Sequence, residues 1–283
     1  MKTLLKPLLP VICAGCLWVS SVQAATPVAE EEIFLGSVAM DVPAAMVQRL
    51  TPLTAYLSKK TGLKVSFRAS PNLGSAVNEL GKDVTQIAYL TPVAYIEAQE
   101  KYKAKPLVSP LTHGKSTFNL VVVVHQDSNI QNMADLVGKS FALGDEKALL
   151  QRAVVVNGGV GLHQFSRFGF LKHYDNIAKA VLNKDFDAGI LKDTLYEKFA
   201  AQGLRKIHTS PPLSAYLFAV NEKVPAETAN KLRTAFLALK TDSAEGKEVI
   251  KALDQAYDGF VSVEDKEYDG VRRLIAPFQK PAK

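Results

Sequence analysis

Short apolar runs with strand character alternate with amphipathic helical stripes along almost the whole chain. Residues 33–40 have the pattern of a buried strand, and apolar residues recur every three or four positions over 46–57, as on one helix face. Residues 64–69 then alternate apolar and polar, which is typical of a second strand. Strands that alternate with helices pair in parallel and are covered on both faces. The pattern therefore predicts an α/β fold with mostly parallel sheets flanked by helices.

Two further strands interrupt this order and predict a division into two lobes. The chain has 283 residues, more than one domain of roughly 100 to 200 residues needs. The most strand-like run starts at residue 118, and a second run at 214–220 follows two consecutive prolines. If both runs cross between sheets, one lobe contains residues 26–117 with 219–283 and the other contains residues 118–218.

The first 24 residues have the composition of an export signal. Two lysines precede an apolar stretch that is too short for a membrane span, which needs about 20 residues. Val22-Gln23-Ala24 places small residues at the two positions that a signal peptidase reads. We expect cleavage before Ala25 and a periplasmic mature protein. The alternative is lipoprotein processing at Ala14-Gly15-Cys16, which would anchor the chain through Cys16.

Composition excludes several functional classes. Both cysteines, Cys13 and Cys16, lie in the export signal, so the mature chain has no thiol chemistry. Loss of Lys2 and Lys6 leaves 32 basic residues against 28 acidic ones, a small excess that favours anionic ligands mildly and gives no support for nucleic-acid binding. No hydrolase elbow, phosphate loop or zinc-protease motif occurs, and the histidines lack metal-ligand spacing. We therefore expect a monomeric binding protein without enzymatic activity, metal or cofactor.

Polar side chains gather in the loops that follow the predicted strands. Ligands of open α/β sheets bind beyond the carboxyl ends of strands, where helix N-termini present free N–H groups. The loops in question are 40–41, 89–91, 144–147, 173–174 and 192–193. The predicted ligand contacts in or near these loops are Asp41, Thr91, Tyr95, Lys147, His173 and Tyr174. Thr91 has a plain helix cap as its alternative role, Lys147 a solvated surface charge, and Tyr89 is equally well explained as a core aromatic.

Four segments together resemble a known family. Residues 49–58 read RLTPLTAYLS, residues 87–95 read IAYLTPVAY, residues 135–142 read DLVGKSFA, and residues 180–189 read AVLNKDFDAG. In this order they resemble the periplasmic phosphate, phosphite and phosphonate binding proteins of ABC transporters. The resemblance implies a two-lobed type II periplasmic binding fold with two crossover hinge strands. It also implies that a small anionic solute binds between the lobes and passes to an ABC permease.

One segment departs from that family. After the strand at 140–143 the family continues with a Ser-Thr segment that holds the anion, whereas this chain has Glu146-Lys147-Ala148. The family's ligand histidine falls on His173 or Tyr174. Lys147 supplies a charge without the fixed geometry of hydroxyl donors. A second hypothesis is therefore a periplasmic sensory or accessory protein that signals to a membrane sensor, and neighbouring genes for a permease or for a histidine kinase would separate the two.

Overall fold

The computed structural model describes residues 32–38, 43–71, 73–146 and 149–279. The predicted export signal, its cleavage site before Ala25 and the alternative site at Cys16 lie outside these residues. Among the described residues, no helix is long and apolar enough to cross a membrane.

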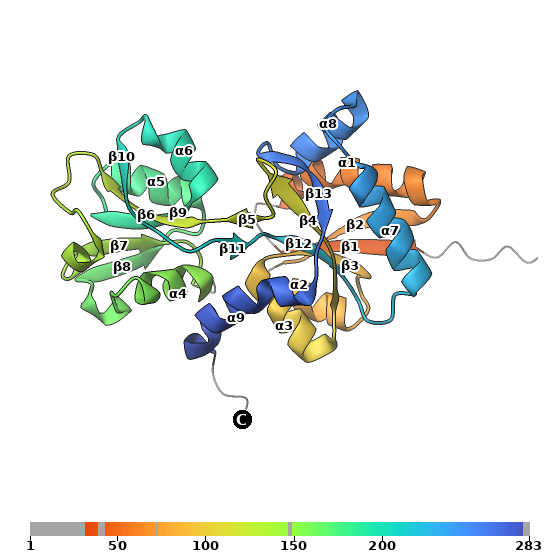
Figure 1. Ribbon diagram of the computed structural model, residues 1–283, viewed down its shortest axis with the longest axis horizontal. Helices are drawn as coiled ribbons and strands as arrows, with labels where there is room; N and C mark the ends of the chain where they lie inside the picture. Colours follow the sequence, from red (N-terminus) through yellow and green to blue (C-terminus); the bar gives the residue numbers. More distant parts are fainter. Residues whose placement is uncertain (1–31, 39–42, 72, 147–148, 280–283) are drawn as a thin grey trace, which may run out of the picture. The chain divides into compact units, whose positions relative to one another are not determined.

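Two mixed sheets organise the described chain (Figure 1). The first has the order β13-β4-β12-β3-β1-β2 and the second the order β10-β6-β9-β7-β8. The strands of the first sheet are β1 (Glu32–Ser37), β2 (Lys64–Ala69), β3 (Ile87–Leu90), β4 (Lys105–Thr112), β12 (Leu217–Val220) and β13 (Tyr257–Ser262). Those of the second are β6 (Leu120–His125), β7 (Ser140–Leu143), β8 (Arg167–Phe170), β9 (Ala188–Lys192) and β10 (Leu204–Thr209).

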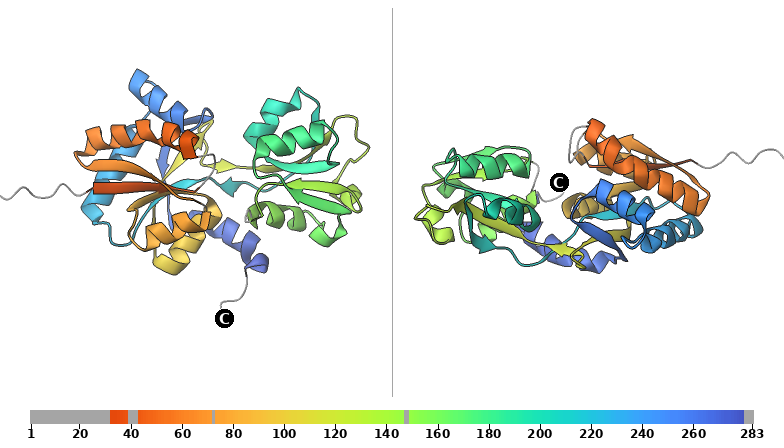
Figure 2. Two further views of the ribbon diagram at one scale, coloured as in Figure 1. Left: turned by 180° about the vertical axis from the view of Figure 1, so that it is seen from behind. Right: turned by 90° about the horizontal axis from the view of Figure 1, so that it is seen from above.

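Helices cover both faces of the first sheet, and Figure 2 shows them on either side of β1. On one face lie α1 (Pro43–Thr61), α7 (Ala226–Ala238) and α8 (Ala244–Leu253), which share an apolar core with the side chains of Leu35, Tyr89 and Phe218. On the other lie α2 (Leu73–Gly81), α3 (Pro92–Tyr102) and α9 (Asp269–Ile275), which pack around Ala88 and Ala219. The side chains alternate between these two faces, as the period of a strand requires.

The second sheet is covered in the same way. The helices α5 (Tyr174–Leu182) and α6 (Asp193–Ala200) pack on Val121, Ala142 and Leu191, and α4 (Leu149–Asn157) packs on the opposite face. Helix α5 approaches β9 closely at Gly189, where a Cβ atom would lie 2.5 Å from Cγ2 of Ile177. This close approach packs the middle of α5 against the first residues of β9.

The chain passes from the first sheet to the second through β5 (Thr117–Phe118) and returns through β11 (Leu213–Ser214), and these two short strands pair antiparallel (Figure 1). The predicted α/β class with helix-flanked sheets is confirmed. The sheets are mixed rather than mostly parallel, because β4 lies between two antiparallel partners and β6 does too. The predicted crossing runs at 118 and 214 agree with β5 and β11, whereas the lobe boundaries remain a prediction.

Candidate ligand-binding site

The strands of the first sheet bring four chain segments to one edge. Because β12 pairs antiparallel with β3, Leu217 at the start of β12 lies opposite Leu90 at the end of β3. In the same way Tyr257, the first residue of β13, lies opposite Thr112, the last residue of β4. This edge is therefore the carboxyl end of β3 and the place where β12 and β13 begin.

The second sheet presents the equivalent edge where β9 ends. Lys192, the last residue of β9, lies opposite Leu120 at the start of β6. The next residue, Asp193, fixes the incoming chain: its N–H donates to the Asn119 carbonyl at 2.9 Å and its Oδ2 accepts from the Asn119 N–H at 2.8 Å. The chain thus enters the second sheet beside the carboxyl end of β9, where ligands of α/β sheets bind.

Lys192 is enclosed by aromatic rings from the crossing strand and the first sheet. Its Nζ lies 5.4 Å from the ring centroid of Phe118, 5.8 Å from that of Tyr216 and 5.8 Å from that of Tyr257. An ammonium within about 6 Å of a ring face is attracted by the ring quadrupole. We call these four residues the lysine cage.

The charge of Lys192 is largely buried and has no direct partner among the described residues. Burial lowers the pKa of Lys192, while Asp254 and Asp193 act in the opposite direction. Neither acid forms an ion pair with it among the described residues: Asp193 accepts hydrogen bonds from the N–H groups of Asn119 and Thr194, and Asp254 accepts one from Ala256. No described residue accepts a hydrogen bond from Nζ. A buried ammonium whose donors remain available is suited to an anionic ligand.

Neutral tyrosine hydroxyls line the same edge. Tyr89 and Tyr257 share a hydrogen bond of 2.6 Å between their hydroxyl oxygens, and the Tyr89 ring lies 5.8 Å from that of Tyr216. Burial raises the pKa of each of these three tyrosines, and the neighbouring carboxylate of Asp254 raises it further. These hydroxyls therefore remain protonated at neutral pH, and one of the two protons of Tyr89 and Tyr257 is donated within their pair.

Among the predicted contacts that the structure describes, Tyr174 interacts electrostatically with a member of the lysine cage. It is the first residue of α5, and its phenol raises the pKa of Tyr216. Burial is the main cause that raises the pKa of Tyr174 itself, and the charge of Asp193 raises it further. His173 is the exposed N-cap residue of α5, and its side chain makes no capping hydrogen bond. Asp41 and Lys147 lie outside the described residues.

Thr91 and Tyr95 have partners within the protein. The Thr91 hydroxyl accepts a hydrogen bond from the Ala94 N–H at 3.2 Å, so Thr91 caps α3 and the predicted start of this helix is confirmed. Tyr95 is fully buried, packs its ring on Tyr268 and donates its hydroxyl proton to Asp265 Oδ1 at 2.6 Å. These contacts favour a packing role for Tyr95, because its hydroxyl is directed at the segment before α9.

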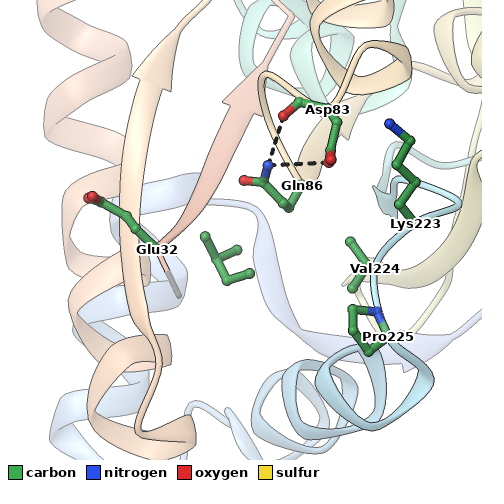
Figure 3. A pocket seen from close by; sticks show the side chains of 7 residues that line it. Glu32, Asp83, Gln86, Lys223, Val224 and Pro225 are labelled. Carbon is green, nitrogen blue, oxygen red and sulfur yellow. Dashed lines mark hydrogen bonds between the residues drawn. The ribbon is translucent and has the colours of Figure 1, made fainter. Parts of the chain in front are cut away.

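A hollow lies at the amino ends of β1 and β3, at the end of the first sheet opposite to the carboxyl end of β3 (Figure 3). It is lined by Glu32, Asp83, Gln86 and Lys223, with apolar side chains of the chain after β12. Gln86 is already engaged there, because its amide nitrogen donates to Asp83 and its Oε1 accepts from the Phe34 N–H at 2.9 Å. This end of a sheet is not the usual ligand end, so the lysine cage is the stronger candidate.

One sequence signal points to the lysine cage, because 192–193 is one of the loops expected beyond strand ends. Its other members, Phe118, Tyr216 and Tyr257, were not predicted. Residue type alone does not distinguish an aromatic side chain of a core from one that surrounds a charge.

Comparisons with known proteins identify the family. The family described as "ABC transporter, phosphonate, periplasmic substrate-binding protein" matches residues 35–268. The chain is 25% identical over 274 residues to the phosphate-import protein PhnD of Mycolicibacterium smegmatis, covering 86% of this chain and 85% of that protein.

Solved structures agree on the fold. A binding protein component of an ABC phosphonate transporter from Pseudomonas aeruginosa superposes with a TM-score of 0.71 at 21% identity, covering 87% of this chain and 85% of the other. PhnD1 of Prochlorococcus marinus in complex with methylphosphonate gives 0.75 at 17% identity, covering 87% and 98%. The aliphatic sulphonate binding protein SsuA of Escherichia coli gives 0.59 at 14% identity, covering 88% and 86%. The resemblance seen in the sequence is thus confirmed, and the chain belongs to the phosphonate family of periplasmic substrate-binding proteins of ABC transporters, which are binding proteins and not enzymes.

Proposed function

We propose that this protein is an exported solute-binding protein that captures a small oxyanion of the phosphate and phosphonate class and delivers it to an ABC permease. In this proposal residues 26–117 with 219–283 form one lobe and residues 118–218 the other. The ligand binds between them at the lysine cage, and β5 and β11 act as the hinge. The observation that carries the proposal is the buried ammonium of Lys192, which has no hydrogen-bond acceptor among the described residues.

The chemistry of the lysine cage favours an oxyanion. An ammonium presents three N–H donors, and a desolvated charge binds an opposite charge more strongly than an exposed one does. The hydroxyls of Tyr89, Tyr216 and Tyr257 are neutral. One proton of the Tyr89–Tyr257 pair is used in the bond between them, so the other proton and that of Tyr216 add donors without adding charge. A ligand with several acceptor oxygens would therefore use both kinds of donor.

The relatives support this class of ligand. The mycobacterial relative is a phosphate-import protein, and PhnD1 was solved with methylphosphonate. The loop after β7 also bears on the source of the positive charge. Its first N–H, that of Gly144, donates to Oε1 of Gln151 at 2.7 Å and is not available to a ligand. We assign the main charge contact to Lys192, because its largely desolvated ammonium has no acceptor among the described residues.

Isothermal titration calorimetry on the mature protein tests the proposal. Phosphate, phosphite, methylphosphonate and methanesulfonate are titrated into the wild type, and the best ligand is then titrated into Lys192→Met. Hydrogen bonds to charged groups contribute about 1.5 to 3 kcal/mol, so the variant should bind roughly 10- to 150-fold more weakly.

The matched control is Lys223→Met, because Lys223 lines the hollow of Figure 3. This variant should bind like the wild type. Binding that survives in Lys192→Met but is lost in Lys223→Met would move the site to the other edge of the sheet. Absence of binding by all four anions would refute the proposed ligand class.

A further inference from the structure

We infer that the site selects oxyanions without an ammonium group of their own, because Lys192 already fills the aromatic enclosure in which such a group would bind. The inference rests on the proposed function, since it concerns the same site and narrows the class of ligand. It concerns what the ligand carries besides its anionic group, which neither the fold nor the relatives specify.

The first step is the geometry of the lysine cage. Three rings surround one point within 5.4 to 5.8 Å of their centroids. Such enclosures are a known way for proteins to recognise ammonium groups of ligands. Here the ammonium belongs to the protein and is attached to the end of β9, so the enclosure holds a positive charge before any ligand arrives.

The second step is the effect of a second positive charge. A ligand ammonium beside the lysine cage would be repelled by Lys192, and little solvent is present there to screen the two charges. The acids that face Lys192 are Asp193 and Asp254. Both carboxylates accept hydrogen bonds from backbone N–H groups and neither forms an ion pair with Nζ among the described residues, so they compensate the desolvation of Lys192 only in part.

A third observation concerns the anchoring of the Lys192 side chain. Lys192 is the last residue of β9, and its backbone lies opposite Leu120 in the pairing of β9 with β6. The next residue is held by two hydrogen bonds to Asn119. The base of the side chain is therefore fixed, and an ammonium that enters the enclosure has to compete with a tethered one.

Two ligands that differ in one group test the inference. Propylphosphonate and 2-aminoethylphosphonate have the same number of heavy atoms along the chain, and only the terminal methyl or ammonium differs. Calorimetry on the wild type should give at least about tenfold tighter binding of propylphosphonate. In Lys192→Met the enclosure loses its positive charge, which should reduce this preference at least tenfold, and Lys192→Arg should retain it because the charge remains.

Each outcome has a distinct meaning. Equal or tighter binding of 2-aminoethylphosphonate by the wild type overturns the inference and would assign the ligand ammonium to Asp254. An unchanged preference in a folded Lys192→Met variant overturns it as well. If neither phosphonate binds, the same comparison is made with propanesulfonate and 2-aminoethanesulfonate: a preference for propanesulfonate supports the inference while refuting the phosphonate class, and failure of all four refutes both. The wild-type comparison decides the matter even if a variant does not fold.

Discussion

Replacing Tyr95 with Phe separates a packing role from a ligand-binding role at this position. The substitution keeps the buried ring on Tyr268 and removes only the hydroxyl, which donates to Asp265 Oδ1 at 2.6 Å. A hydrogen bond to a charged group contributes about 1.5 to 3 kcal/mol. Asp265 also pairs with Arg272 and its side chain is 45% exposed, so we expect the lower limit, about 1.5 kcal/mol. For a protein of this size that loss lowers Tm by roughly 3 to 6 °C.

Urea unfolding at pH 7 and calorimetric ligand titration, done on the same preparation, measure both effects. Tyr102→Phe is the matched control, because Tyr102 ends the same helix and bonds through its hydroxyl to the uncharged Asn78 at an exposed site. The control should lose less than about 0.5 kcal/mol. The argument fails if Tyr95→Phe unfolds like the wild type, or if it loses ligand affinity without losing stability.

Three further predictions concern charge. Hydrogen bonds from Arg272 and Tyr95 lower the pKa of Asp265 despite its burial. Asp265 therefore stabilises the fold above about pH 4 and loses this effect as the pH falls through its lowered pKa. In urea unfolding at pH 3, the difference in stability between the wild type and Tyr95→Phe should be smaller than at pH 7. Ser140→Ala removes the hydroxyl that donates to Asp187 at 2.7 Å and accepts its N–H at 2.9 Å, and should cost about 1 to 3 kcal/mol in the same assay. Ligand-free Lys192→Met should be more stable than the wild type by about 1 kcal/mol at pH 7. Because the pKa of Lys192 is lowered in the folded state, this difference in stability should disappear as the pH rises through that lowered pKa toward about 10.5. An equally stable or less stable variant at pH 7 would show that Lys192 does not carry a buried charge.

Much of the fold was predictable because its signals are local. The start of α3 follows from a capping hydroxyl, that of Thr91, followed by a proline at the first helical position, Pro92. The structure shows both features. The direction of the added strands was not predictable in this way. The pairing of Leu217 with Leu90 joins residues 127 positions apart, and no local pattern records on which side of β3 the returning chain will pair.

In the candidate site, too, some residues were predictable from local sequence pattern and others were not. Lys192 follows a run, residues 187–191, that the sequence pattern predicts as a strand, so its position at the end of a strand followed from local pattern. Its enclosure did not, because Phe118 comes from the outgoing crossing, Tyr216 from the returning one and Tyr257 from the start of β13. Tyr95 illustrates the opposite case: helical spacing from Thr91 places it on the same side of α3, yet its hydroxyl meets Asp265, which is 170 residues away.

The use of lysine as the charged donor has consequences for recognition. Hydroxyl and backbone donors fix the directions of ligand oxygens, whereas an ammonium on a flexible stem supplies charge with little directional preference. In the site that we propose, the aromatic rings of the lysine cage would restrict that stem, and the tyrosine hydroxyls would supply the directional contacts. Burying the ammonium costs folding stability, and an anionic ligand recovers that cost only while it is bound. The same desolvation that destabilises the empty protein is therefore what makes its contact with an oxyanion strong.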